Sequence, residues 1–152
     1  MRQELADALD WGQAHADFDR AVDRFPVTLR GRRVRGLPYS AWQILEHVRI
    51  AQEDLLDFAI NPRYASKAWP EEYWPNNPKP PNARAWNASI AAFRKDRKAL
   101  KRLATNARIK LDAKIPHGTG QTYLREILLA IDHTAYHVGE LVVLRRLLGA
   151  WK

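Results

Sequence analysis

The stretch YSAWQILEHVRIAQEDLLDFAI, residues 39–60, decides the fold, because it has the pattern of one long amphipathic helix with signals at both ends. Ser40 followed three residues later by Gln43 matches a capping box, in which each side chain bonds the other residue's backbone N–H. Asn61-Pro62 ends the pattern, since a proline disfavours helical backbone in the residue before it. We therefore expect a helix that begins after Ser40 and ends before Pro62.

Three further segments have amphipathic spacing and lengths of about 20 residues or more. They are Arg2–Phe25, which Pro26 ends, residues 83–106, and residues 122–148, where Thr122 is the expected N-cap and Gly149 the stop. Four such helices without a convincing strand pattern predict an all-α fold, a four-helix bundle. The length of 152 residues predicts a single domain over 1–152.

Two long connections separate the first three helices. Residues 27–39 hold four arginines, and residues 61–82 hold six prolines and no helical or strand periodicity. Loops this long are uncommon in compact domains and tend to cover binding sites. The aromatic side chains of the second loop also allow a plain anchoring role, because burial favours large apolar groups. They are Tyr64, Trp69, Tyr73 and Trp74.

Three histidines lie on helix faces that the apolar pattern directs toward the core. His133 and His137 are four residues apart, so a rotation of about 100° per residue leaves their rings only ~40° apart on one face. His47 shares its face with Ile44 and Ala51. Three converging imidazoles bind one divalent ion and leave a coordination position open, which suits catalysis better than a structural role. The alternative is three buried histidines that each satisfy their nitrogens separately.

Composition removes several kinds of chemistry. The chain has no cysteine, which excludes disulfides, thiolate metal sites and cysteine nucleophiles. Its charged N-terminus lacks an apolar signal core, and we see no run of about 18 apolar residues. We therefore expect a cytoplasmic protein that does not engage a membrane.

The net charge of +8 is concentrated in the middle of the chain. Residues 61–121 carry 13 basic and 4 acidic side chains, whereas residues 1–60 carry 8 and 10. A basic face and arginines 30–35 allow a nucleic-acid binder. We regard this as the less favoured interpretation, because the face has the pattern of a solvated surface and no helix-turn-helix or RNA-binding motif occurs. The basic face consists of Arg94, Arg97, Lys98, Lys101 and Arg102.

Two segments resemble a known family. IPHGTGQTYLREILLAIDHTAYHVGELVVLRRLLG, residues 115–149, is similar to the last helix of the DinB/YfiT-like superfamily of proposed metalloenzymes, and residues 39–58 are similar to its second helix. The resemblance implies a four-helix bundle that holds a divalent ion, commonly nickel or zinc, through three histidines. The matching positions are His47, His133 and His137.

The resemblance also implies an activity and a partner. Relatives include transferases that use low-molecular-weight thiols such as bacillithiol or mycothiol, which implies a metal-dependent thiol S-transferase or a related detoxification enzyme. A metal-dependent hydrolase and a non-catalytic, metal-stabilised dimeric bundle are the alternatives. Relatives often form homodimers, to which Trp11 or Trp151 could contribute if they are not part of the core.

Four further residues have undecided roles. Glu140 stands where the family often has glutamine, and it is an acceptor for a ligand histidine, a general base or a solvent-facing carboxylate. Asp54, seven residues after His47, is a possible fourth ligand. His15 has the pattern of a surface residue, and His117 that of a structural residue in a turn.

Overall fold

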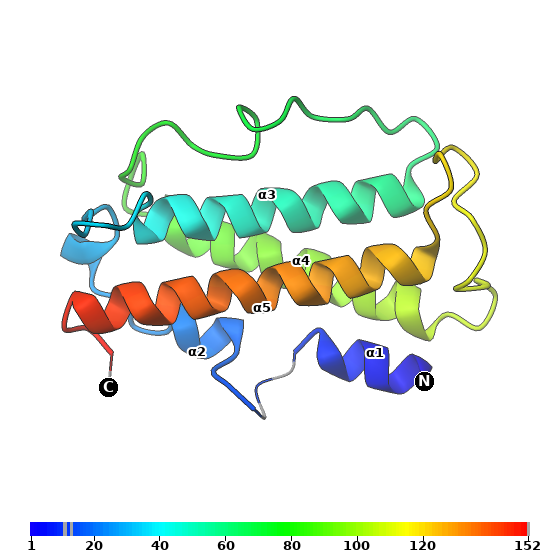
Figure 1. The fold of residues 1–152 in the computed structure, drawn as a ribbon, viewed down its shortest axis with the longest axis horizontal. Helices are drawn as coiled ribbons and strands as arrows, with labels where there is room; N and C mark the ends of the chain where they lie inside the picture. The colour runs from blue at the N-terminus through cyan, green and yellow to red at the C-terminus, as the bar shows by residue number, and fades with distance from the viewer. Residues whose placement is uncertain (11, 13, 152) are drawn as a thin grey trace.

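The computed structural model describes residues 1–10, 12 and 14–151 and confirms an all-α bundle (Figure 1). An isolated bridge between Lys114 and Thr122 is the sole β pairing in these ranges. The helices are α1 (Arg2–Ala8), α2 (Phe18–Val22), the 3-10 turn η1 (Val27–Leu29), α3 (Ala41–Ile60), α4 (Ala85–Thr105) and α5 (Tyr123–Leu147).

The start signals of α3 and α5 are the predicted ones. Ser40 Oγ accepts from the backbone N–H of Gln43 at 3.2 Å, and the Gln43 side chain accepts from the Ser40 N–H at 3.2 Å. Thr122 accepts from the N–H of Arg125 at 3.2 Å. Both long helices that carry the histidines therefore begin where their own side chains satisfy the first free N–H groups.

The prediction of one helix over Arg2–Phe25 is wrong, because the structure divides this segment into α1 and α2. The Asp17 carboxylate accepts from the N–H of Arg20 at 2.7 Å, which makes Asp17 the N-cap of a new helix. A capping residue has extended rather than helical backbone, so the helix cannot run through it. Trp11 falls in the gap and lies outside the described residues.

The long loop sets the direction of the helices. It carries the chain back along the outside of α3, so that α3 and α4 point the same way while α5 runs opposite to both (Figure 1). α1 and α2 lie end to end and together take the fourth place in the bundle, where α1 packs against α4 and α2 against α5. A simple alternation of helix directions is therefore not the topology.

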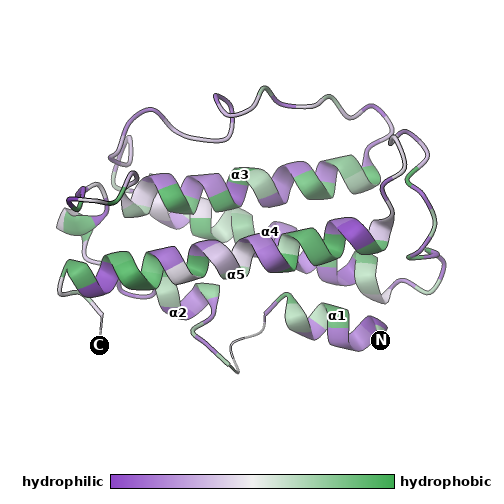
Figure 2. Cartoon of the chain, in the orientation of Figure 1, coloured by the Kyte–Doolittle hydropathy of each residue, from purple (hydrophilic) through white to green (hydrophobic). Residues whose placement is uncertain are grey.

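The interior has two hydrophobic clusters with a polar layer between them. One cluster surrounds Trp86 and Phe93, and the other surrounds Leu100 and Ile127. On α5, His133 and His137 fall between the residues that this helix contributes to the two clusters, and the middle of α5 is correspondingly hydrophilic (Figure 2). On α3, His47 lies beside Val48, the last residue that this helix contributes to the first cluster. Buried Gln52 belongs to the same layer and donates to the Phe93 carbonyl at 2.8 Å.

α5 is the one helix of the described residues that is both long and apolar enough to count as a candidate membrane span. An 18-residue window within it has a mean hydropathy of 1.4, enough to cross a membrane by length and composition alone. This is a weak sign, because core helices of bundles pass the same test and α5 packs on α2 and α3. The cytoplasmic location stays a prediction.

Candidate metal centre

The structure brings the three predicted histidines together. His47 comes from the second turn of α3, and His133 and His137 come from successive turns of α5. One ring nitrogen of each lies within 4.8 Å of those of the other two, and the Nε2 atoms of His47 and His133 are 3.0 Å apart. This three-histidine group could hold a divalent metal ion.

The loop fixes which nitrogen of His47 faces the group. His47 Nδ1 lies 3.1 Å from the backbone carbonyl of Tyr73. A carbonyl only accepts, so Nδ1 carries the proton and Nε2 presents its lone pair toward the other rings. A ring held in this way by its outer nitrogen is typical of histidines that bind metals.

Glu140 does the same for His137. His137 Nδ1 lies 2.6 Å from Glu140 Oε2 and donates to it, so that in the neutral ring Nε2 carries the lone pair. Of the three roles considered for Glu140, the geometry favours the acceptor behind a ligand histidine. The solvent-facing interpretation does not describe it, because the carboxylate is about two-thirds buried beside the ring.

Burial keeps the rings of His47 and His133 neutral. His47 and His137 are 2% and 6% exposed, and His133 is half-buried. Desolvation is the main cause that lowers the pKa of His47 to about 4, with a further contribution from His137. Desolvation and then the other two rings lower the pKa of His133 to about 4. Neutral imidazoles are the form that donates to a cation.

These separations fit a divalent ion. Metal–nitrogen bonds of about 2.0–2.1 Å at tetrahedral angles place two ligand nitrogens about 3.4 Å apart. The separations in the group begin at 3.0 Å and stay within 4.8 Å, so small ring rotations suffice. Three neutral imidazoles suit zinc and nickel, and also copper and iron.

The proline-rich loop, residues 61–82, covers the site. The Trp74 ring stacks on His47 with centroids 3.8 Å apart and planes 5° apart. It also stacks on Tyr39 at 3.7 Å and lies edge-on to His137 at 6.0 Å. Trp69 lies further out, 6.2 Å from His47, with two-thirds of its surface exposed. The aromatic residues of the loop therefore both anchor it and enclose one ligand ring.

Polar side chains of α3 bind the loop backbone at successive turns. Ser40 Oγ donates to the Pro78 carbonyl at 2.6 Å, and Gln43 Nε2 donates to the Pro75 carbonyl at 2.9 Å. His47 continues the series through its bond to the Tyr73 carbonyl. The loop therefore runs antiparallel to α3 along the face that carries the histidine.

Asp54 holds the next part of the loop. Its carboxylate accepts from the Tyr73 hydroxyl at 2.6 Å and from the Tyr64 hydroxyl at 3.1 Å. Asp54 is not part of the three-histidine group identified among the described residues, and its observed role is to bind the loop. Sequence reasoning missed Tyr73 and Trp74 as site residues, although the cluster of aromatic residues between prolines was the signal that pointed to this loop.

The remaining two histidines are elsewhere. His15 is exposed, with Nδ1 2.9 Å from the carbonyl of Ala16. His117 Nε2 donates to the carbonyl of Phe58 at 2.7 Å and so ties the turn before α5 to the end of α3. Both positions agree with the roles expected from the sequence.

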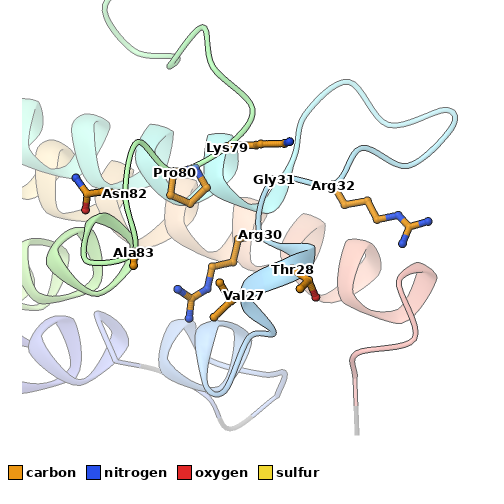
Figure 3. Close-up of a pocket in the computed structure, with 9 residues that line it drawn as sticks. All are labelled: Val27, Thr28, Arg30, Gly31, Arg32, Lys79, Pro80, Asn82 and Ala83. Carbon is orange, nitrogen blue, oxygen red and sulfur yellow. The ribbon is translucent and has the colours of Figure 1, made fainter.

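A cavity of about 620 Å³ lies away from the histidines, between η1 and the end of the proline-rich loop. It contains three cationic residues, Arg30, Arg32 and Lys79. Their side chains point in different directions rather than toward a common centre (Figure 3). The cavity therefore does not have the convergent geometry of an anion site.

Much of the basic face of α4 is neutralised within the molecule. Arg97 bonds Asp10 at 2.9 Å and Asp19 at 2.6 Å, and Arg94 also bonds Asp19 at 2.6 Å. Lys101 pairs with Asp10. These ion pairs attach α1 and α2 to α4, and they leave fewer cations to contact phosphates.

Comparison with known proteins gives one match. No similar protein was found among curated proteins or among solved structures. A family model described as the DinB superfamily matches residues 10–141, which include all three histidines and most of the bundle. On this match and the all-α architecture, the chain belongs to the DinB superfamily.

Proposed function

We propose that the protein binds one divalent ion, zinc or nickel, through His47, His133 and His137 and acts as a metal-dependent thiol S-transferase or a related detoxification enzyme. One observation carries the metal proposal: the Tyr73 carbonyl and Glu140 hold protons on the outer nitrogens of two rings, so that their lone pairs point inward. A cation can accept all of these converging lone pairs, whereas a hydrogen bond between two of the rings uses only one of them.

The surroundings support an open centre. The nearby carboxylates of Asp54 and Glu140 are engaged, the first by two tyrosine hydroxyls and the second by His137. A divalent ion with three protein ligands keeps a position for a thiol or a water, whose acidity it raises. The engagement of Glu140 favours thiol transfer over hydrolysis, since hydrolysis needs a free general base near the water.

Metal analysis tests the first half of the proposal. We expect about one zinc or nickel ion per chain in protein purified without added metal, and almost none in the His47→Ala/His133→Ala variant. His15→Ala is the matched control, because it removes an exposed imidazole that lies outside the group. Equal metal content in the wild type and the double variant would overturn the proposal.

A turnover assay tests the second half. The protein is incubated with a panel of low-molecular-weight thiols and an alkylating electrophile, and thiol consumption is followed with and without a chelator. We expect consumption that depends on both protein and metal. If chelation lowers only the melting temperature and no thiol is consumed, the ion has a stabilising role without catalysis.

We also propose that the protein forms a homodimer through the outer face of α5. Four apolar side chains on this face are 47–66% exposed: Leu128, Tyr136, Val143 and Leu147. A side chain at Gly139, at the centre of the face, would contact nothing within 4 Å, so a second helix can approach closely there. Exposed apolar stripes of this kind mark protein interfaces.

Charge supports a self-complementary arrangement of this face. Asp132 and Arg146 lie seven residues before and after Gly139, and both are exposed. In an antiparallel pair of α5 helices with a two-fold axis at Gly139, each Asp132 meets the other chain's Arg146. Trp151 is half-buried between the guanidinium groups of Arg20, Arg145 and Arg146, so its ring already has packing partners.

Sedimentation of charge variants tests this interface. Asp132→Arg and Arg146→Asp should each weaken the dimer at least tenfold, and the two together should restore it, because the swap recreates the opposite charges. A wild type that stays monomeric at about 100 μM, or a dimer whose stability neither variant changes, would overturn the proposal.

A further inference from the structure

Tyr73 joins two residues of α3 that are two helical turns apart. Its backbone carbonyl accepts from His47 Nδ1 at 3.1 Å, and its hydroxyl donates to Asp54 at 2.6 Å. His47 and Asp54 are separated by seven residues, about 10 Å along the helix axis, and share one face. One loop residue therefore touches a candidate ligand at one end and a buried carboxylate at the other.

Asp54 is built as an acceptor for the loop. It is 9% exposed, and two tyrosine hydroxyls, those of Tyr64 and Tyr73, point to it. Burial first, and then the charge of Asp54, raise the pKa of Tyr64 to about 12, so its hydroxyl stays a donor at neutral pH. A buried carboxylate with two hydroxyl donors has a fixed position, because losing either donor leaves its charge poorly compensated.

We infer that Asp54 is a positioning residue for the metal centre, acting through Tyr73 on His47. The Tyr73 hydroxyl is held by Asp54, which places the Tyr73 carbonyl where it keeps the His47 proton on Nδ1 and the lone pair on Nε2. The inference rests on the proposed metal binding and extends it to a residue that contacts neither the ion nor the rings.

The contact between Tyr73 and Asp54 also affects the position of Trp74, the ring that covers His47. Trp74 follows Tyr73 directly in the chain and stacks on His47 at 3.8 Å. Release of Tyr73 from Asp54 therefore frees both the carbonyl that orients His47 and the ring that shields it. In this arrangement the packing of the loop against α3 and the affinity for the metal ion are coupled. Such a coupling is reciprocal, so a bound ion also stabilises the packed position of the loop.

A double-mutant cycle tests the inference with zinc as the probe. Zinc affinity is measured by competition with a chromophoric chelator for the wild type, Asp54→Ala, Tyr73→Phe and the double variant. We expect each single variant to bind zinc 10–100-fold more weakly, as losses behind metal ligands do. The double variant should be no weaker than the worse single variant, because both remove one contact.

Three controls separate positioning from general damage. Asp54→Asn keeps an oxygen acceptor and should recover part of the affinity. Glu53→Ala, next to Asp54 but half-exposed and paired with Arg49, should leave zinc affinity unchanged. Tyr64→Phe keeps the Tyr73–Asp54 bond and should have the smaller effect of the two tyrosine variants. Circular dichroism establishes that each variant is folded.

A second measurement compares the variants in the absence of metal and then adds zinc to the wild type. Trypsin cleavage after exposed Arg63 and half-buried Lys67 reports how firmly the loop is seated. We expect Asp54→Ala and Tyr73→Phe to be cut several-fold faster than the wild type and Glu53→Ala, with zinc slowing cleavage of the wild type. If the wild type binds zinc and a folded Asp54→Ala binds it equally, the inference is overturned while the proposed function stands. If the wild type binds neither zinc nor nickel, the proposed function fails and the inference with it.

Discussion

His137 and Glu140 are one helical turn apart on α5, and the histidine donates from Nδ1 to the carboxylate across 2.6 Å. Because the spacing is three residues within one helix, the contact needs no tertiary packing to align it. The carboxylate increases the electron density on the opposite nitrogen and fixes the ring plane. The pair therefore orients one candidate ligand through a contact within α5 alone.

Replacing Glu140 tests whether its carboxylate supports metal binding by His137. Glu140→Ala removes the acceptor and should lower zinc affinity about 10–100-fold. Glu140→Gln keeps a carbonyl oxygen that still accepts from Nδ1, so its loss should be the smaller of the two. Competition with a chelator measures both. An affinity in Glu140→Ala equal to that of the wild type would contradict the assigned role.

The metal-free protein should lose stability in mild acid. The pKa of His47 and of His133 is lowered from 6.5 to about 4 in the folded chain, chiefly by burial, and returns to its ordinary value on unfolding. Between these values the unfolded chain binds more protons, so the free energy of unfolding falls as the pH drops from about 6.5 to about 4.

Thermal unfolding in the presence of a chelator, at several pH values between 7.5 and 4.5, measures this loss. The His47→Gln/His133→Gln variant should show a flatter dependence between pH 6.5 and 5, where few carboxylates titrate. If stability depends on pH in the same way in the two proteins, the pKa values of His47 and His133 are not lowered in the folded chain.

The two predicted N-caps should differ in their contribution to stability. Thr122→Ala removes a cap and should lower the free energy of unfolding by about 1 kcal/mol. Ser40→Ala removes a cap and also the bond to the Pro78 carbonyl, so a loss of about 2 kcal/mol is expected. Urea unfolding of both variants gives the comparison, and an equal loss would mean that the Ser40–Pro78 bond contributes nothing.

Nucleic acid should not bind tightly. Arg94, Arg97 and Lys101 form ion pairs with Asp10 and Asp19, which leaves the basic face of α4 partly neutral. We expect no retardation of a 30-base-pair duplex in a gel at roughly 50 mM salt, where phosphate contacts are strong. A shift that weakens steeply as salt is raised would contradict this expectation.

The long helices were predictable because their signals are local. Ser40, Gln43 and Thr122 act on backbone groups within three residues, so their pattern in the sequence is already the structural rule. The prediction of one continuous helix over Arg2–Phe25 was wrong for a related reason. The apolar spacing of this segment continues through Asp17, but α1 has already ended at Ala8, and the Asp17 side chain caps the start of a separate helix. Periodicity alone does not register such a break.

The three histidines were found from spacing and resemblance, whereas the partner of His47 was not. The bond from His47 to the Tyr73 carbonyl joins residues 26 apart through an irregular loop, and a backbone carbonyl leaves no mark in the sequence. The contact of Glu140 with His137 is local and was among the roles considered. The role of Asp54 depends on where two loop tyrosines end, which no periodic pattern specifies.

The polar layer has a consequence for how such a protein changes over evolutionary time. Each hydrophobic cluster is assembled from its own set of residues on α3, α4 and α5, and neither set includes a histidine. Substitutions in the polar layer therefore leave the hydrophobic packing of both clusters in place. Over evolutionary time, side chains of this layer can therefore change while the apolar packing that holds the bundle together is retained.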